Sequence, residues 1–527
     1  MSQSSNYKAE GKQAFEHMEN TNEKNGDMIV QREGGFDDES LTVAEEAALR
    51  KSVLWKLDTR ILPVLALLFL FSFLDRTNIG NARNLGLQKD LALTSKQYSN
   101  CLAIYFVTYI VSEVPATLVL KFITPKIWLP LLTGLWGLLA AMMGVVTSYK
   151  GLLAVRALLG ALEGGLLPGM VLYLSMLYKR DEMALRMGLV YSSASLSGAF
   201  GGLLATGLNK MAGVGGYAGW RWIFLMEGMY VQLLLVLPPF TVQSTQICTR
   251  HRLTIIVAAG AWIFLCTSVD TASFLTPQER IYARTRLNED VPQPTDDTAS
   301  ANHGIFSWYQ VRRAIFSIQT WLSAFAYFAI LSALYSFGLF VPTIIQGLGY
   351  SAIRAQLFSV PPYAVAAFLT VIVAILSDKF KSRGPFMLFC LPFSIAGYAL
   401  IRTSDSNSVK YGALFLMASG LYTSVPPVLV WLSNNSAPHY KRATAAGLQL
   451  SIANCGGFVA TFIYPSKQGP HYIEGHTIIL GLLCGAWVLV ACNVAYCAWQ
   501  NKKKEDGKCE QFRGDGSDRD PAFKYIL

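Results

Sequence analysis

The sequence predicts an all-α polytopic membrane protein with twelve transmembrane helices in two sets of six. Of its 527 residues, 52% are hydrophobic and 15% are charged, and the mean hydropathy is +0.35. This composition is too apolar for an ordinary soluble globular protein. The chain also contains a series of apolar stretches close to the ~20 residues that a helix needs to cross a membrane. A polar segment separates the first six stretches from the last six.

The predicted spans follow one another along most of the chain. In the first half they are 61–78, 98–120, 128–147, 151–178, 184–208 and 222–275. In the second half they are 320–346, 355–376, 386–401, 411–432, 443–464 and 477–499. The expected domains are an N-terminal cytoplasmic tail (1–56), an N-terminal six-helix bundle (57–275), a cytoplasmic linker (276–318), a C-terminal six-helix bundle (319–500) and a C-terminal cytoplasmic tail (501–527).

Basic residues set the expected orientation. Cytoplasmic loops of membrane proteins are enriched in Lys and Arg, and with the N-terminus inside, the inner loops hold more of these residues than the outer loops. Both tails add to the same side, as Lys502, Lys503 and Lys504 do after the last span. The formal charge of +10 therefore reflects membrane topology, and no nucleic-acid partner is expected.

The sixth stretch, 222–275, is about twice as long as one span requires and contains Arg250 and Arg252 near its middle. Two separate spans here would place both arginines in the membrane at a cost on the order of 5–7 kcal/mol. Our hypothesis is that residues 237–260 are an insertion, such as a translated intron. If the segment is genuine, the sixth helix is distorted.

Two charged pairs lie inside predicted spans: Asp75 with Arg76 in the first, and Arg156 with Glu163 in the fourth. Each of these side chains costs roughly 2.5–3.5 kcal/mol at mid-bilayer, so their presence indicates that the protein moves an ion or a polar solute. On a helix, Glu163 returns to within about 20° of Arg156. Gly160 lies between them and leaves room for a solute or for another helix. The structural alternatives are a salt bridge to a neighbouring helix, and snorkelling of the first pair at a helix end.

Catalytic and cofactor sites are not indicated. The nine cysteines form no C-x-x-C pair, which argues against a disulfide framework or a zinc site. There is no G-x-x-x-x-G-K-[ST] phosphate loop and no Ser-His-Asp constellation. We therefore expect neither an enzyme nor an ATP-driven pump, and no metal or organic cofactor.

Three motifs carry a family resemblance. The runs DTRILP at 58–63, FLDRTNIGNA at 73–82 and GWRWIF at 219–224, the last followed by Glu227 and Gly228, resemble the fungal anion:cation symporters of the major facilitator superfamily. That group contains allantoate, nicotinate and pantothenate permeases. The resemblance implies two six-helix bundles that rock about a central site. It also implies symport of an organic anion by alternating access.

The same resemblance implies roles for the charged residues. In related symporters the acid beside the first-helix arginine and the acid two turns after the fourth-helix arginine take part in proton coupling, here Asp75 and Glu163, with the proton as coupling ion. Arg76 and Arg156 are the expected substrate clamps, because planar guanidinium donors match the two oxygens of a carboxylate. Helix rise places Asp75, Arg76 and Arg156 in one outer cluster. All four are expected to share one water-accessible chamber.

Weaker binding candidates are polar groups within apolar spans. Tyr105, Tyr109 and Asn454 fit substrate binding, but each also fits an ordinary interhelical hydrogen bond. Glu113 follows a family pattern, and its role stays open.

Residues 376–384 resemble the superfamily's cytoplasmic loop motif, in which an Asp at a helix end meets basic partners and latches the outward-open state. The resemblance implies gating roles for Asp378, Lys379 and Arg383. Together these observations predict a monomeric, plasma-membrane symporter whose partners are a small organic carboxylate and the lipid bilayer. The alternative is a nutrient sensor or an inactive transporter-like protein, because a distorted sixth helix would permit binding without net flux.

Overall fold

The computed structural model describes residues 43–119, 123–179, 182–236, 268–289, 308–465, 468–469, 472–514 and 517–527. The chain divides into two units, Met1–Ser52 and Val53–Leu527. All contacts discussed below lie within the second unit. The suspected insertion, 237–260, falls outside the described residues.

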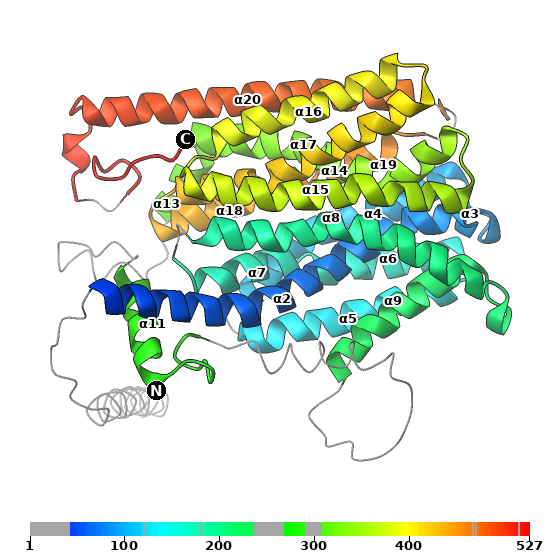
Figure 1. The fold of residues 1–527 in the computed structure, drawn as a ribbon, viewed down its shortest axis with the longest axis horizontal. Coiled ribbons are helices and arrows are strands. Elements are labelled where there is room, and N and C mark those ends of the chain that lie inside the picture. The colour runs from blue at the N-terminus through cyan, green and yellow to red at the C-terminus, as the bar shows by residue number, and fades with distance from the viewer. Residues whose placement is uncertain are drawn as a thin grey trace, which may run out of the picture. The chain divides into compact units, whose positions relative to one another are not determined.

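The described residues form helices and no strands (Figure 1). The first half contains α2 (Val43–Asn84), α3 (Leu87–Asp90), α4 (Ser95–Val119), α5 (Pro125–Val145), α6 (Tyr149–Glu163), α7 (Leu166–Ser175), α8 (Met183–Leu208) and α9 (Gly219–Val236). The linker contributes α11 (Pro277–Glu289) and α13 (Trp308–Ile315). The second half contains α14 (Ile318–Gly347), α15 (Ala352–Lys379), α16 (Gly384–Thr403), α17 (Asn407–Asn434), α18 (His439–Asn454), α19 (Gly456–Phe462) and α20 (Ile473–Glu505). Short 3-10 turns lie at Asn209–Met211, Val214–Gly216 and Glu510–Phe512.

Ten helical segments of the described part are long and apolar enough to cross a membrane, with α6 and α7 counted as one and α18 and α19 as another. The helices α4 and α9, with 25 and 18 residues, occupy the second and sixth predicted positions but are not among the ten. The prediction of an all-α polytopic membrane protein is confirmed. The count of twelve spans is supported only in part, because the sixth stretch continues beyond α9 outside the described residues.

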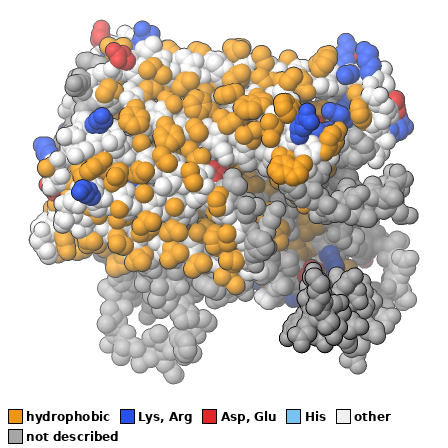
Figure 2. Space-filling view, turned by 180° about the vertical axis from the view of Figure 1, so that it is seen from behind, with side chains coloured by type: hydrophobic (Ala, Val, Ile, Leu, Met, Phe, Trp, Pro, Cys, Tyr) orange, Lys and Arg blue, Asp and Glu red, His pale blue; other side chains and the backbone are white. Residues whose placement is uncertain are grey.

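One face of α5 shows how the helices meet lipid. The side chains of Ile127, Leu131, Leu135, Leu138 and Met142 are each more than 40% exposed. They recur at helical spacing, so they form one outward apolar face. Figure 2 shows hydrophobic side chains over most of the visible surface, with charged groups mainly toward its edges. An apolar surface of this extent is suited to contact with acyl chains.

The two halves pack together along α8 and α15, which lie side by side in Figure 1. Small residues permit the close approach. A Cβ atom at Gly188 would lie 2.5 Å from the Cβ atom of Ala374, and one at Gly198 would lie 2.5 Å from the ring of Tyr363. A second contact between the halves joins α4 to α18 and α19.

Contacts between the halves occur at both ends of the bundle. At the predicted outer end, the Thr343 hydroxyl donates to Oδ1 of Asn84 at 3.2 Å. At the predicted cytoplasmic end, Gly188 of α8 lies directly against Ala374 of α15, as described above. The halves therefore touch on both sides of the centre.

Two membrane helices are interrupted near their middle. The helix α6 ends at Glu163, with Gly164 and Gly165 between it and α7. The helix α18 ends at Asn454, with Cys455 between it and α19. The linking residues keep a right-handed helical backbone, so each span is locally distorted but continuous. Both interruptions follow directly on a residue that the sequence indicated as a site candidate.

Gly160 serves helix packing. A Cβ atom here would lie 2.2 Å from the carbonyl oxygen of Tyr105 and 2.4 Å from Oγ1 of Thr108. The space beside Gly160 is therefore filled by the α4 backbone. Of the two roles that the sequence left open, the structure shows close helix approach.

We expect Gly160→Ala to lower the thermal unfolding midpoint of the purified protein, because the added methyl must displace α4 and overpacking of this kind costs about 1–3 kcal/mol. The matched control is Gly481→Ala, where a Cβ atom would meet no heavy atom within 4 Å. That control should be neutral or slightly stabilising. Scanning fluorimetry in detergent measures both midpoints, and equal midpoints would contradict the packing role.

Candidate functional site

Glu163 accepts three hydrogen bonds at the end of α6. Its carboxylate receives bonds from the hydroxyl groups of Ser72 and Tyr105 and from Nη2 of Arg76 at 2.9 Å. Both members of the Arg76–Glu163 ion pair are buried. A buried ion pair requires additional hydrogen bonds to offset the loss of hydration, and the two hydroxyl groups supply them to the carboxylate.

Arg76 lies in an aromatic cage that spans both halves of the bundle. Its guanidinium carbon is 4.7 Å from the ring centroid of Phe73, 5.0 Å from that of Tyr109 and 5.4 Å from that of Tyr335. Nε donates to the Tyr105 hydroxyl at 3.1 Å, and Nη1 donates to the Tyr335 hydroxyl at 3.0 Å. Because Tyr335 belongs to α14, one guanidinium group links the first half to the second.

The hydrogen bonds continue from Tyr335 through the second half. The Tyr335 hydroxyl donates to Oδ1 of Asn454 on α18 at 2.9 Å. Nδ2 of Asn454 donates to Oε2 of Glu113 on α4 at 3.2 Å. The network therefore leaves the first half, passes through α14 and α18, and returns to the first half. Glu113, whose role the sequence left open, is the second buried acid in this hydrogen-bond network, after Glu163.

Arg156 is buried near the same tyrosine. Its guanidinium carbon is 5.9 Å from the ring centroid of Tyr105. Within the described part of the chain, its Nε and Nη2 have no hydrogen-bond partner. A buried donor without a partner is costly. These two nitrogens can therefore bind an anion without first breaking an ion pair.

Asp75 faces away from Arg76, although the two are adjacent in sequence. Its carboxylate accepts a hydrogen bond from Nε1 of Trp136 on α5 and interacts with the carboxyl group of Glu227 on α9. Nδ2 of Asn78 donates to Glu227 at 2.8 Å. One oxygen of each acid has no donor among the described residues.

Two expectations about the charged residues need correction. Within the predicted outer cluster, Arg76 and Asp75 point to different sides, because neighbouring residues on a helix point about 100° apart, whereas Asp75 and Arg156 stay within electrostatic reach of each other. Arg76 turns toward Glu163, and Asp75 turns toward α5 and α9. The four residues also do not share a water-accessible chamber in this conformation, since each is at most 5% exposed. The centre of the bundle is packed closed.

The sequence did not identify Ser72, Tyr335 or Glu227 as site residues. Glu227 could have been identified, because an acid within an apolar helix is itself a signal of function. Ser72 and Tyr335 carry no such signal, since hydroxyl groups commonly bridge membrane helices. Among the weaker candidates, Tyr105 donates and accepts hydrogen bonds in the network, whereas Tyr109 contributes its ring.

The residues expected to form the gate lie at the end of α15. Asp378 forms an ion pair with Arg383, and Nη1 of Arg383 donates to the Ser377 hydroxyl at 2.8 Å. Lys379 is exposed and is not part of this pair. The structure therefore brings Asp378 and Arg383 together within the second half and leaves Lys379 outside the pair.

Comparison with known proteins agrees with this architecture. The Major Facilitator Superfamily model matches residues 65–461. An uncharacterized transporter of Schizosaccharomyces pombe is 36% identical over 484 residues, which cover 91% of this chain and 91% of that protein. The high-affinity nicotinic acid transporter of Saccharomyces cerevisiae is 32% identical over 487 residues, which cover 91% of this chain and 85% of that protein.

A solved structure has the same fold. The bacterial homolog of the human lysosomal transporter Spinster, in its inward-facing and unoccupied conformation, matches with a TM-score of 0.57 and 16% identity, over 83% of this chain and 96% of that chain. The family and the relatives are transporters, which confirms that the protein is not an enzyme. The chain belongs to the major facilitator superfamily and is a multi-pass membrane transporter for a small molecule.

Proposed function

We propose that the protein is a proton-coupled symporter that carries a small organic carboxylate across the plasma membrane by alternating access, as a monomer. The buried Arg76–Glu163 ion pair is the observation that carries the proposal, because its guanidinium group also bonds Tyr335 of the other half. Charge pairing and contact between the halves therefore depend on one side chain.

A solute carboxylate competes with Glu163 for Arg76. A carboxylate that loses its guanidinium partner in a low-dielectric site favours the neutral, protonated form. Binding of the anion would therefore drive a proton onto Glu163, so that solute and proton move together. The Asp75–Glu227 pair offers a second place for a proton in the same half.

The second arginine supports the choice of an anionic substrate. Arg156 presents two buried nitrogens without partners in the described part of the chain, and a guanidinium group can bond both oxygens of a carboxylate. A relative, the nicotinic acid transporter of Saccharomyces cerevisiae, is named for an aromatic carboxylic acid. Aromatic side chains around Arg76 would suit a ring-bearing carboxylate.

Release of the solute requires the halves to separate on one side. The halves are joined in the present conformation by the bonds of Tyr335 to Arg76 and of Asn454 to Glu113, and by the packing of α8 on α15. A solute that occupies Arg76 removes one of these links, which favours opening. This sequence of events is the alternating access of rocking bundles.

We expect Glu163→Gln to abolish pH-driven accumulation of substrate in proteoliposomes while exchange of bound substrate persists, because the amide cannot carry the coupled proton. The matched control is Glu505→Gln, an exposed acid at the end of α20, which should accumulate substrate normally. The assay uses radiolabelled nicotinate and then a panel of carboxylates. Undiminished accumulation by Glu163→Gln refutes the coupling role, whereas wild-type protein that binds but never accumulates substrate favours the sensor alternative.

We expect Arg156→Lys to weaken substrate binding by roughly tenfold or more, since a charge-assisted hydrogen bond contributes about 1.5–3 kcal/mol and an ammonium group cannot replace the planar pair of donors. Equilibrium binding of radiolabelled substrate to the purified protein measures the change. Arg402→Lys, at an exposed position, serves as the control. Full affinity in Arg156→Lys would remove this residue from the substrate site.

We expect Tyr335→Phe to lower the thermal unfolding midpoint, because loss of the hydroxyl leaves Arg76 and Asn454 each without one buried partner, at a cost of about 1–3 kcal/mol. Tyr422→Phe is the control, since no hydrogen bond of the Tyr422 hydroxyl is found among the described residues. A midpoint for Tyr335→Phe equal to that of the control would show that the link between the halves contributes no stability.

A further inference from the structure

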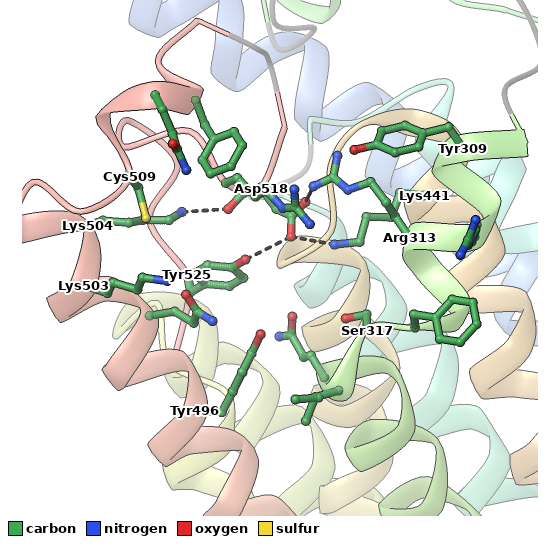
Figure 3. Close-up of a pocket in the computed structure, with 18 residues that line it drawn as sticks. Tyr309, Arg313, Ser317, Lys441, Tyr496, Lys503, Lys504, Cys509, Asp518 and Tyr525 are labelled. Atoms are coloured by element: carbon green, nitrogen blue, oxygen red, sulfur yellow. Dashed lines mark hydrogen bonds and ion pairs between the residues drawn. The ribbon is translucent and has the colours of Figure 1, made fainter.

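A cavity lies at the predicted cytoplasmic face, away from the central site (Figure 3). Its volume is about 720 Å³, within the range of roughly 300–1,000 Å³ that is usual for small-ligand sites. The walls come from α13, the start of α14, α18, α20 and the C-terminal segment after α20. The C-terminal segment folds back toward the bundle and forms one wall of the cavity.

The lining of this cavity is strongly basic. Among its 18 residues, one carboxylate, Asp518, faces six cationic side chains. The six are Arg312, Arg313, Lys441, Lys503, Lys504 and Arg519. Like charges gathered in one cavity repel one another, so the walls are stabilised by any anion that enters.

Asp518 and backbone carbonyl oxygens bond only some of these six cations. The carboxylate of Asp518 pairs with Arg313 at 3.0 Å and with Lys441 at 2.6 Å. Nζ of Lys504 donates to the carbonyl oxygens of Asp518 at 2.7 Å and of Phe523 at 2.5 Å. Figure 3 shows Asp518 at the centre of these contacts.

Three cations in the lining have no acidic partner among the described residues. Arg312 lies 5.7 Å from the ring of Phe316, Lys503 lies 5.7 Å from that of Trp499, and Arg519 lies 5.2 Å from that of Phe512. None of the three forms an ion pair with another described residue. An anion with a single negative charge would not neutralise all three of these cations.

The surroundings of the cavity mark the level of the membrane surface. Trp308 at the start of α13, Phe316 directly after this helix and Trp499 on α20 are 75%, 75% and 56% exposed. Exposed aromatic rings beside basic residues are typical of the interface between hydrocarbon and water. Basic pockets at this depth on the cytoplasmic side bind phosphorylated headgroups.

We propose that the cavity binds an anion with two or more phosphate groups, such as a phosphorylated inositol ring at the membrane surface. Arginine and lysine side chains both bind phosphate oxygens strongly. The ligand would occupy the side of the cavity lined by Arg312, Lys503 and Arg519, next to the Asp518 contacts. This proposal is independent of the transport chemistry proposed for Glu163.

Binding there would hold the C-terminal segment against the gate. The carbonyl oxygen of Leu527 accepts a hydrogen bond from the backbone N–H of Arg383 at 2.5 Å. The Ile526 carbonyl oxygen accepts from Nε1 of Trp431 and from Nδ2 of Asn435, each at 2.8 Å. The last two residues of the C-terminal segment therefore connect the wall of the cavity to the start of α16.

The test measures binding to the purified full-length protein with two probes: a short-chain phosphatidylinositol bisphosphate and free inositol trisphosphate. Both present the same phosphates, so the first reports a lipid source and the second a soluble source. Short-chain phosphatidylcholine serves as the uncharged comparison. We expect saturable binding of at least one phosphorylated probe and slower amide hydrogen exchange in residues 517–527 when it is bound.

A triple variant, Arg312→Gln, Lys503→Gln and Arg519→Gln, should weaken binding by about a hundredfold, because each basic residue near a headgroup contributes roughly fivefold. The matched control removes three exposed cations outside the cavity, Lys508→Gln, Arg513→Gln and Lys524→Gln. Lys503→Gln alone should weaken binding roughly fivefold. This single variant still tests the proposal if the triple variant misfolds. Absence of saturable binding of either phosphorylated probe, or equal losses in the triple variant and its control, would overturn the proposal.

Discussion

The centre of the protein is organised around the need to satisfy one buried guanidinium group. A positive charge removed from water is tolerated only when it is paired and hydrogen-bonded, and Arg76 receives Glu163 as counter-charge and tyrosine hydroxyl groups as further partners. Aromatic rings surround the guanidinium group. Since Tyr335 lies on α14, the same requirement joins the two halves. Under the proposed function, a solute that takes over Arg76 would change the charge balance and the contact between the halves in one step.

The backbone makes this arrangement possible at two places. Gly160 lets α6 approach the α4 backbone closely enough for Tyr105 to reach Glu163. The interruptions after Glu163 and Asn454 end α6 and α18 where their last side chains meet the network. The linking residues stay in the right-handed helical conformation, so each span continues past its last network residue. Packing and polar chemistry thus depend on the same short segments.

The predicted cytoplasmic side has a separate organisation. The Asp378–Arg383 pair lies at the end of α15, and the last residues of the chain bond the start of α16 and the end of α17. The basic cavity lies beside this segment, so the gate, the C-terminal segment and the cavity form one connected region. The central network contains no residue of this region among those described. The proposed regulation at the surface and the proposed coupling at the centre therefore involve separate sets of described residues.

The sequence alone determined the properties that depend on local composition. Apolar length identified the spans, and ionisable residues within them identified Asp75, Arg76, Arg156 and Glu163, because the cost of burying charge is the same wherever the helix packs. Only the tertiary structure decided which of these residues meet. Arg76 and its partner Tyr335 are 259 positions apart, and Asp75 turns to Glu227 because helix rotation, which neighbouring helices set, directs each side chain.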